Sequence, residues 1–355
     1  MTIKEFKIFP YFLKFITSFE ISNRKFSYRE GFIISMSDES GNSGIGECAP
    51  LPGFSYEEID EVKDQLRKLS ISFIDLQIDD NISSIESFLN AKLLYPSVKF
   101  GIEQGFLNLL LGRVKNFFKN NFESINAEIP VNAVFGISDN ISLIEGIEKK
   151  LENGYSTFKI KIGKKPFEED FRLIESVRKY FGNDIKIRLD VNGAWTYDEA
   201  LDNLKRIEQF KIEYIEEPSS NLEIMDRLAK KTNVPAAADE SIGSLSEALD
   251  FIKSSGIKFF VIKPMILDGI FSTIKLIEEA KKYNKKIVIS SAFESNIGLS
   301  ALAFLAALND RKYAHGLDTG GLFEKNTIKE IFEILNGTFY FESQKFPITF
   351  NPKEL

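Results

Sequence analysis

Lysine side chains stand at the ends of short apolar segments, in positions that suit proton transfer. Lys159 and Lys161 lie two residues apart in STFKIKIG, and Lys263 comes near the end of KFFVIKP. Residues i and i+2 of a strand face the same side, so the first two ammonium groups oppose each other's protonation. A neighbouring cation acts in the same direction, and a lowered pKa makes a lysine a usable base near neutral pH. We therefore expect at least one of this pair to act as a base.

Carboxylates end three successive segments, a pattern that suits a metal site built from oxygen atoms. Asp190 follows IKIRL, two glutamates at 216–217 end IEYIEE, and Asp239 follows VPAAA. Asn192 has the same facing as Asp190 and can support the ligands. With no histidine or cysteine among them, converging carboxylates favour a hard cation, Mg²⁺ or alternatively Mn²⁺.

The segments that carry these residues alternate with amphipathic stretches, which predicts βα units. Eight short apolar segments follow residue 128, and helical spacing lies between them, as in EEDFRLIESVRKYF. Eight strands within about 190 residues indicate a closed parallel barrel, whose active site lies at the C-terminal ends of the strands. Lys263 would then lie four strands from Lys161, on the far side, with the carboxylates between them. No Gly-rich loop follows the first strand, which disfavours a dinucleotide-binding fold.

The first 125 residues predict a smaller domain of a different kind. REGFIISMSDESGNSGIGECAP reads as a hairpin around a turn-rich centre, and SYEEIDEVKDQLRKL has apolar residues at helical spacing.

The composition narrows the class of function. The chain has 355 residues and a net charge of −7, which gives no electrostatic footprint for nucleic acid or an anionic membrane. No apolar run is long enough to span a bilayer, and the start lacks a signal-peptide layout. A single cysteine, Cys48, fits a reducing cytoplasm. The single histidine, His315, leaves lysines and carboxylates to do any acid/base work.

Each motif also has a simpler explanation when it stands alone. A K-x-K pair is often a solvated strand edge, and D-x-N or E-E-P often marks a turn or a helix start. Charged side chains at the ends of five successive apolar strands are costly unless they are paired or bound to metal. Their joint order therefore favours a function over packing.

The motifs FKIKIG, RLDVN, YIEEP, AADES and VIKP, in that order, resemble the enolase superfamily and its muconate-lactonizing subgroup. The resemblance implies a (β/α)7β TIM-like barrel at 126–319 under an N-terminal α+β capping domain at 1–125. A C-terminal segment of about 320–355 would pack back on the capping domain. The implied site residues are Asp190, Glu216 and Asp239 as Mg²⁺ ligands, Asn192 and Glu240 supporting them, and Lys161 and Lys263 as acid/base groups.

Three further segments are similar to o-succinylbenzoate synthases within that subgroup: GECAPLPGFS at 46–55, SSAFESNIGLSAL at 290–302 and GLDTGGLF at 316–323. They imply a loop that closes over the substrate, and the dehydration of 2-succinyl-6-hydroxy-2,4-cyclohexadiene-1-carboxylate through an enediolate. SAFES and DTGG depart from the usual motifs, which affects the substrate contacts rather than the catalytic frame. The substrate-binding residues implied are Lys159, Arg188, Phe54, Ser291 and Gly316.

Two rival functions share these features. An N-succinylamino acid racemase or a dipeptide epimerase of the same superfamily would use both lysines for proton transfer. Dipeptide epimerases carry a D-x-D pattern at strand eight, where this chain has one acid, Asp318. A more remote alternative is a non-catalytic binding barrel. In the catalytic cases the partner is a small carboxylate, and the sequence leaves the oligomeric state open.

Overall fold

The computed structural model describes residues 1–21, 24–136, 139–328, 334–341 and 350–352. It begins with a three-stranded antiparallel sheet in the order β1-β2-β3 (Ile3–Ile21, Arg24–Asp38 and Ser43–Cys48). The predicted hairpin is therefore confirmed as β2 and β3, which pair directly. Four helices follow: α1 (Ile59–Ser72), α2 (Ile82–Asn90), α3 (Pro96–Arg113) and α4 (Phe117–Asn121).

Helix α3 lies directly against β3, and two glycines make this approach close. A Cβ atom added to Gly46 would lie 1.9 Å from the carbonyl oxygen of Gly101. Only a residue without a side chain fits between backbones at this separation. This packing fixes the end of β3, and with it the loop that starts at Ala49.

A second, parallel sheet has seven strands in the order β11-β10-β9-β8-β7-β6-β5. Isolated bridges pair Val131 with His315 and Ser290 with Gly316, so residues 315–316 lie between the first and last strands. The sheet is thereby closed, and the predicted fold class is confirmed. The strands are Ala133–Phe135, Thr157–Lys161, Lys186–Asp190, Tyr214–Glu216, Ala236–Ala238, Phe259–Ile262 and Lys286–Ile289, from β5 to β11.

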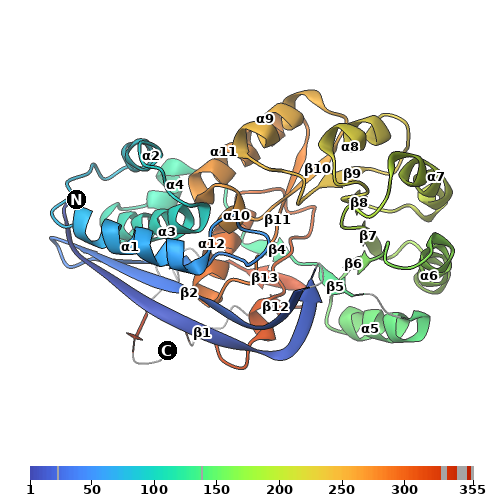
Figure 1. The fold of residues 1–355 in the computed structure, drawn as a ribbon, viewed down its shortest axis with the longest axis horizontal. Helices are drawn as coiled ribbons and strands as arrows, with labels where there is room; N and C mark the ends of the chain where they lie inside the picture. The colour runs from blue at the N-terminus through green and yellow to red at the C-terminus, as the bar shows by residue number, and fades with distance from the viewer. Residues whose placement is uncertain (22–23, 137–138, 329–333, 342–349, 353–355) are drawn as a thin grey trace.

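Helices follow the barrel strands and cover their outer face (Figure 1). Local sequence sets their ends: Asp139 accepts hydrogen bonds from the amides of Ile141 and Ser142, and Thr196 forms a capping box with Glu199. The helices are α5 (Asn140–Glu152), α6 (Phe167–Phe181), α7 (Tyr197–Ile207), α8 (Leu222–Ala229), α9 (Leu245–Ser254), α10 (Pro264–Leu267), α11 (Gly269–Lys282) and α12 (Asn296–Ala307).

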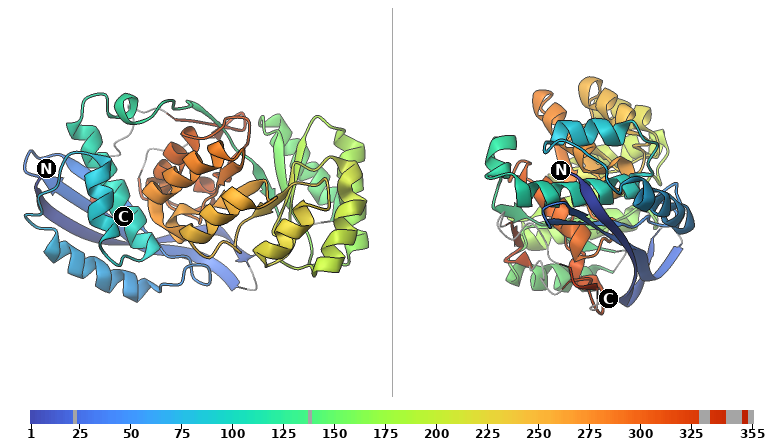
Figure 2. Two further views of the ribbon diagram at one scale, coloured as in Figure 1. Left: turned by 90° about the horizontal axis from the view of Figure 1, so that it is seen from above. Right: turned by 90° about the vertical axis from the view of Figure 1, so that its left-hand side faces the viewer.

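The helix α12 connects the two parts of the molecule. Each of its residues is buried, because it contacts both β11 of the barrel and β3 of the N-terminal sheet. In Figure 2, the orange helices lie between the blue N-terminal part and the yellow-green part of the barrel. The N-terminal domain is thus held firmly against the barrel.

The C-terminal segment runs back toward β1. The backbone of Phe323 pairs with Phe15, whose ring stacks on it at 4.7 Å, and Phe350 contacts Phe9 at 5.4 Å between ring centroids. A small antiparallel sheet, β12-β13-β4 (Ile334–Leu335, Thr338–Tyr340 and Glu128–Pro130), joins this segment to the start of the barrel. Residues 329–333, 342–349 and 353–355 of the predicted packing segment lie outside the described residues. We retain the domain boundaries near 125 and 319 as a proposal.

In the described part of the chain, no helix has the length and apolar character needed to cross a membrane.

Candidate active site

Three carboxylates meet at the C-terminal ends of neighbouring barrel strands. The register pairs Asp190 at the end of β7 with Glu216 at the end of β8, and Glu216 with Ala237 of β9. Asp239 follows two residues after Ala237, so it shares the same facing. All three side chains are buried. The structure therefore brings together the three residues that the sequence indicated as metal ligands.

Two lysines are bound to these carboxylates. The Nζ of Lys159 lies 2.9 Å from Asp190 Oδ2 and 2.6 Å from Glu216 Oε1. The Nζ of Lys263 lies 2.5 Å from both carboxylate oxygens of Asp239. Burial disfavours the ammonium of Lys159, but the attraction of Asp190 and Glu216 prevails and raises its pKa. The lowered pKa that the spacing of the two lysines suggested is therefore not found at Lys159.

The remaining candidate base, Lys161, begins a row of two hydrogen bonds between polar side chains. Its Nζ donates to Asn192 Oδ1 at 3.4 Å, and Asn192 Nδ2 donates to Glu240 Oε1 at 2.9 Å. Asn192 has a φ of +49°, a left-handed conformation that asparagine tolerates better than most residues. The turn directs the amide between Lys161 and Glu240, next to the carboxylate cluster.

Glu217, the residue after the ligand candidate Glu216, faces away from the cluster. Its Oε1 accepts hydrogen bonds from the backbone amides of Asp239 and Ser241 and from the hydroxyl of Ser241. These bonds fix the turn after β9, which carries Asp239. Glu217 is therefore a support for the cluster, a role that its sequence position alone did not indicate.

The cluster has the chemistry of a site for a divalent cation. Burial raises the pKa of Glu216 against the attraction of Lys159, and the nearby Asp190 and Asp239 add to the rise. The Oε2 atom of Glu216 is buried without a hydrogen-bond donor in the described residues. Crowded carboxylates with an unsatisfied oxygen fit a hard cation such as Mg²⁺.

The carboxylate cluster differs from a preformed metal site in the arrangement of its side chains. Within the described ranges, no three histidine, cysteine or carboxylate side chains are already arranged as ligands around one point. Lys159 contacts Asp190 Oδ2 and Glu216 Oε1, Lys263 contacts both oxygens of Asp239, and the two ammonium groups supply the positive charge there. Binding of a cation by these residues would therefore require the two ammonium groups to release some of those oxygens.

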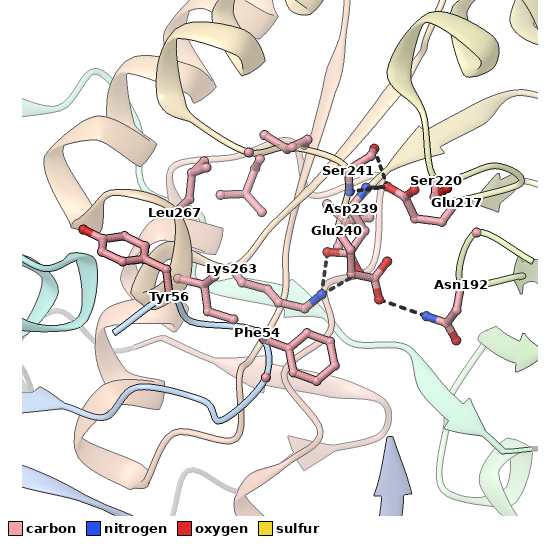
Figure 3. A pocket seen from close by; sticks show the side chains of 17 residues that line it. Phe54, Tyr56, Asn192, Glu217, Ser220, Asp239, Glu240, Ser241, Lys263 and Leu267 are labelled. Atoms are coloured by element: carbon pink, nitrogen blue, oxygen red, sulfur yellow. Dashed lines mark hydrogen bonds and ion pairs between the residues drawn. The ribbon is translucent and has the colours of Figure 1, made fainter. Parts of the chain in front are cut away.

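The cluster opens into a cavity of about 680 Å³. Lys161 and Lys263 both line it, together with Asn192, Glu240, Ser291, Gly316 and, from the N-terminal domain, Leu51 and Phe54. An adjoining chamber of about 480 Å³ shares Phe54, Asp239 and Lys263 with it. Figure 3 shows Phe54 and Lys263 among the residues that line this chamber.

The loop that carries Phe54 is tied to the barrel by a buried arginine. Arg29 donates hydrogen bonds to the carbonyl oxygens of Ala49 and Pro50, and also to that of Phe293 after β11. Its side chain is therefore a fixed bridge between the loop and the barrel. The arrangement gives the N-terminal domain a direct part in shaping the cavity.

Arg188 is not brought to this cavity, contrary to the sequence-based expectation. It is fully buried and donates to Glu213 Oε2 at 2.7 Å, to Asn132 Oδ1 at 3.0 Å and to the carbonyl of Ala314 at 2.9 Å. Although it has the same facing as Asp190, it lies two residues earlier on β7, one layer deeper in the barrel. Its role is to hold the barrel interior.

Ser291 lines the cavity, but its hydroxyl is already occupied. It donates to Glu294 Oε2 at 2.5 Å and accepts from the hydroxyl of Thr319 at 2.8 Å and the amide of Phe293 at 3.0 Å. A hydroxyl has one donor and two acceptor positions, so these three bonds use them all. Thr319, rather than Ser291, keeps acceptor capacity toward the cavity.

Comparison with known proteins places the chain among enzymes. A family model described as "Enolase C-terminal domain-like" matches residues 142–345, and one described as "MenC, N-terminal domain" matches residues 3–109. Over 320 residues the chain is 29% identical to the o-succinylbenzoate synthase of Desulfotalea psychrophila, covering 81% of this chain and 86% of that protein.

Two further similarities extend this comparison. The chain is 29% identical over 304 residues to Protein PHYLLO, chloroplastic, of Arabidopsis thaliana, covering 79% of this chain but only 18% of that longer protein. Among solved structures, the N-succinyl Arg/Lys racemase from Bacillus cereus superposes with a TM-score of 0.86 at 25% identity, covering 96% of this chain and 93% of the other.

Proposed function

The chain belongs to the enolase superfamily, and we propose that it acts within it as an o-succinylbenzoate synthase. The membership confirms the resemblance that the strand-end motifs indicated. The proposed reaction is the dehydration of 2-succinyl-6-hydroxy-2,4-cyclohexadiene-1-carboxylate to 2-succinylbenzoate in menaquinone biosynthesis, by a carbon–oxygen hydro-lyase in the cytoplasm. Its relatives of that name, together with the "MenC, N-terminal domain" match, support this choice.

The observation that carries the proposal is the placement of two lysines around one carboxylate cluster. Lys161 and Lys263 line the same cavity, and they come from β6 and from the end of β10, with three strands between them. A planar intermediate held above the cluster would have one ammonium or amine group near each face. That arrangement suits removal of a proton next to a carboxylate.

The cluster is proposed to bind the metal. Asp190, Glu216 and Asp239 would hold Mg²⁺, or Mn²⁺ in its place, with Asn192 and Glu240 positioning them. A cation bound there would supply a fixed positive charge beside the substrate's carboxylate. Asn192 and Glu240 are already connected by a hydrogen bond of 2.9 Å, so their position needs no rearrangement.

The chain's own residues would carry the proton. Lys161, in its unprotonated form, takes the proton from the carbon next to the carboxylate, which leaves an enediolate on the substrate. Lys263 stabilises this negative charge from the opposite side through its ammonium. Lys161 then returns the proton to the departing hydroxide, so that water leaves, the carbon–oxygen bond breaks and the ring becomes aromatic. Phe54 and Leu51 would exclude bulk water from the cavity.

The direct test is turnover of the cyclohexadiene acid by the purified protein with Mg²⁺. Formation of the aromatic product, followed by ultraviolet absorbance, is the expected result. Glu216→Gln removes one ligand charge but keeps the side-chain shape, so it should be folded and inactive. Unchanged turnover after exhaustive chelation would remove the metal from the proposal.

A second candidate function is racemisation of an N-succinylamino acid. It is favoured by the close superposition on the Bacillus cereus racemase, and it would use Lys161 and Lys263 as two bases. The structure favours a dipeptide epimerase less, because Asp318, the acid just after residues 315–316, is already paired with Lys150 at 2.6 Å. An assay of the α-proton exchange of N-succinylamino acids in deuterated water separates racemase from synthase.

A further inference from the structure

Lys150, one of the described residues of the large cavity, lies apart from the carboxylate cluster. Among the residues that the structure describes, four lysines line this cavity: Lys150, Lys159, Lys161 and Lys263. The last three are hydrogen-bonded to the carboxylates or to Asn192. Lys150 instead comes from the last turn of α5 and pairs with Asp318, just after residues 315–316 that close the barrel. None of the catalytic steps proposed above uses it.

Lys150 is held in place but keeps donors for a ligand. Its Nζ donates to Asp318 Oδ2 at 2.6 Å and lies 4.4 Å from the centre of the Tyr155 ring. The hydroxyl of Tyr155 donates to the same Asp318 oxygen at 2.9 Å. A lysine ammonium has three donors, so this bond to Asp318 leaves two for another acceptor. The side chain of Lys150 is 36% exposed, which keeps the ammonium accessible from the cavity.

The cavity has room beside this lysine. Val134, on the wall formed by β5, is half exposed although it stands on a barrel strand. A Cβ atom added at Gly136 or Gly321, which also line the cavity, would meet nothing within 4 Å. A flexible arm that extends from the carboxylate cluster toward β5 and residues 315–316 would therefore meet open space and then Lys150.

We propose that Lys150 binds a carboxylate at the far end of the substrate's arm and so selects dicarboxylate substrates. Tyr155 and Asp318 position its ammonium. Because Lys150 neutralises Asp318, this end of the cavity does not favour a terminal ammonium group. The inference rests on the proposed function to the extent that the substrate has one carboxylate at the metal site and a second at the end of a succinyl arm.

The test compares two ligands that differ only at the end of the arm. 2-Succinylbenzoate ends in a carboxylate, and 2-butanoylbenzoate has a methyl group in its place. Dissociation constants are measured calorimetrically, with Mg²⁺ present, for the wild type and for Lys150→Gln, Lys150→Arg and Asp318→Asn. Lys149→Gln is the matched control, since Lys149 is the neighbouring, exposed lysine of α5 and does not line the cavity.

We expect Lys150→Gln to weaken binding of 2-succinylbenzoate by about tenfold, the effect of losing a charge-assisted hydrogen bond at a partly exposed site. Binding of 2-butanoylbenzoate should change less than about twofold, and Lys150→Arg should keep most of the preference. Asp318→Asn keeps a side-chain oxygen that can position the ammonium but removes the competing negative charge, so it should act in the opposite direction and tighten binding of the diacid. In turnover, Lys150→Gln should raise KM and leave kcat nearly unchanged.

The outcomes separate this inference from the proposed function. If the wild type dehydrates the cyclohexadiene acid but binds the two ligands equally well, Lys150 does not select the second carboxylate. The same conclusion follows if Lys150→Gln and Asp318→Asn weaken both ligands alike, as loss of a purely structural ion pair would. If the wild type shows no turnover but prefers the diacid, and Lys150→Gln loses that preference, the synthase proposal fails and the inference stands.

Discussion

Replacing Lys263 by alanine tests whether the lysine and a metal ion neutralise the same carboxylate. Lys263 contacts both oxygens of Asp239, whose side chain is 5% exposed, while the lysine side chain is 18% exposed. Removing one partner of a buried ion pair leaves the other charge uncompensated, which costs about 3–5 kcal/mol. The partial exposure of Lys263 puts our expectation at about 3 kcal/mol, the lower end of that range.

The informative comparison is the loss of unfolding free energy in Lys263→Ala with and without Mg²⁺. With EDTA, Lys263→Ala should lower the free energy of unfolding in urea by that amount. With saturating Mg²⁺ the loss should be smaller, because a bound cation would then neutralise Asp239 in place of the ammonium. Lys263→Arg should be closer to the wild type in both conditions, since it retains the charge. Lys282→Ala, which removes an exposed pair with Glu279, is the control and should not change stability measurably.

Two results would refute this reasoning. If Lys263→Ala is as stable as the wild type in EDTA, the ion pair with Asp239 does not contribute in solution. If the loss is equal with and without Mg²⁺, no cation binds at Asp239. Activity adds a third comparison: Lys263→Arg should retain measurably more dehydratase activity than Lys263→Ala, whereas a two-base racemase would lose activity alike in both.

Three other predictions follow from the site and the barrel. Lys161→Arg should lose dehydratase activity as completely as Lys161→Ala, by roughly 10²–10⁴-fold, because arginine keeps the charge but cannot act as a base; substantial kcat in Lys161→Arg would contradict this. Phe54→Ala should raise KM for the cyclohexadiene acid more than it changes the melting temperature, since Phe54 lines the same cavity as Lys161 and Lys263; unaltered steady-state kinetics would remove Phe54 from the site. Burial of His315, whose Nδ1 accepts from the amide of Ile289, lowers its pKa from 6.5 to about 3. The folded state then binds fewer protons than the unfolded state below about pH 6.5, so stability falls with falling pH, by about 1.4 kcal/mol from this group at pH 5.5. His315→Asn, whose amide oxygen can take the place of Nδ1, should remove this component in urea unfolding at pH 8 and pH 5.5, and an unchanged pH dependence would count against it.

The barrel could be predicted because its strands are apolar runs that each end in a polar group. The apolar run indicates a buried strand, and the polar residue after it indicates the end of the strand at the active site. Asp190, Glu216 and Asp239 could therefore be identified together with the strands that carry them. The run IPVNAVF was less informative. The structure divides it into β4, which pairs with the C-terminal β13, and β5, which belongs to the barrel. Pairing with a segment some 200 residues away leaves no local signal in the sequence.

The sequence did not indicate which layer of the barrel a residue occupies, nor which side chains it contacts. The prediction that Arg188 faces the barrel interior was correct. The alternation of side chains along a strand, however, does not tell which layer of the barrel a residue occupies. The hydroxyl of Ser291 is taken up by Glu294 and Thr319, contacts that depend on the loop after β11. Lys150 was not foreseen, because a lysine in the last turn of a helix usually interacts with the helix dipole. Its contact with Asp318 joins residues 168 positions apart.

In the proposed reaction, two lysines and a metal-binding carboxylate cluster dehydrate the cyclohexadiene acid. The most direct measurement is the ultraviolet absorbance of 2-succinylbenzoate, with Mg²⁺ and with EDTA, for the wild type and Glu216→Gln. We predict aromatic product only for the wild type with Mg²⁺. Absence of that product, together with Mg²⁺-dependent racemisation of an N-succinylamino acid by the same preparation, would contradict the synthase proposal.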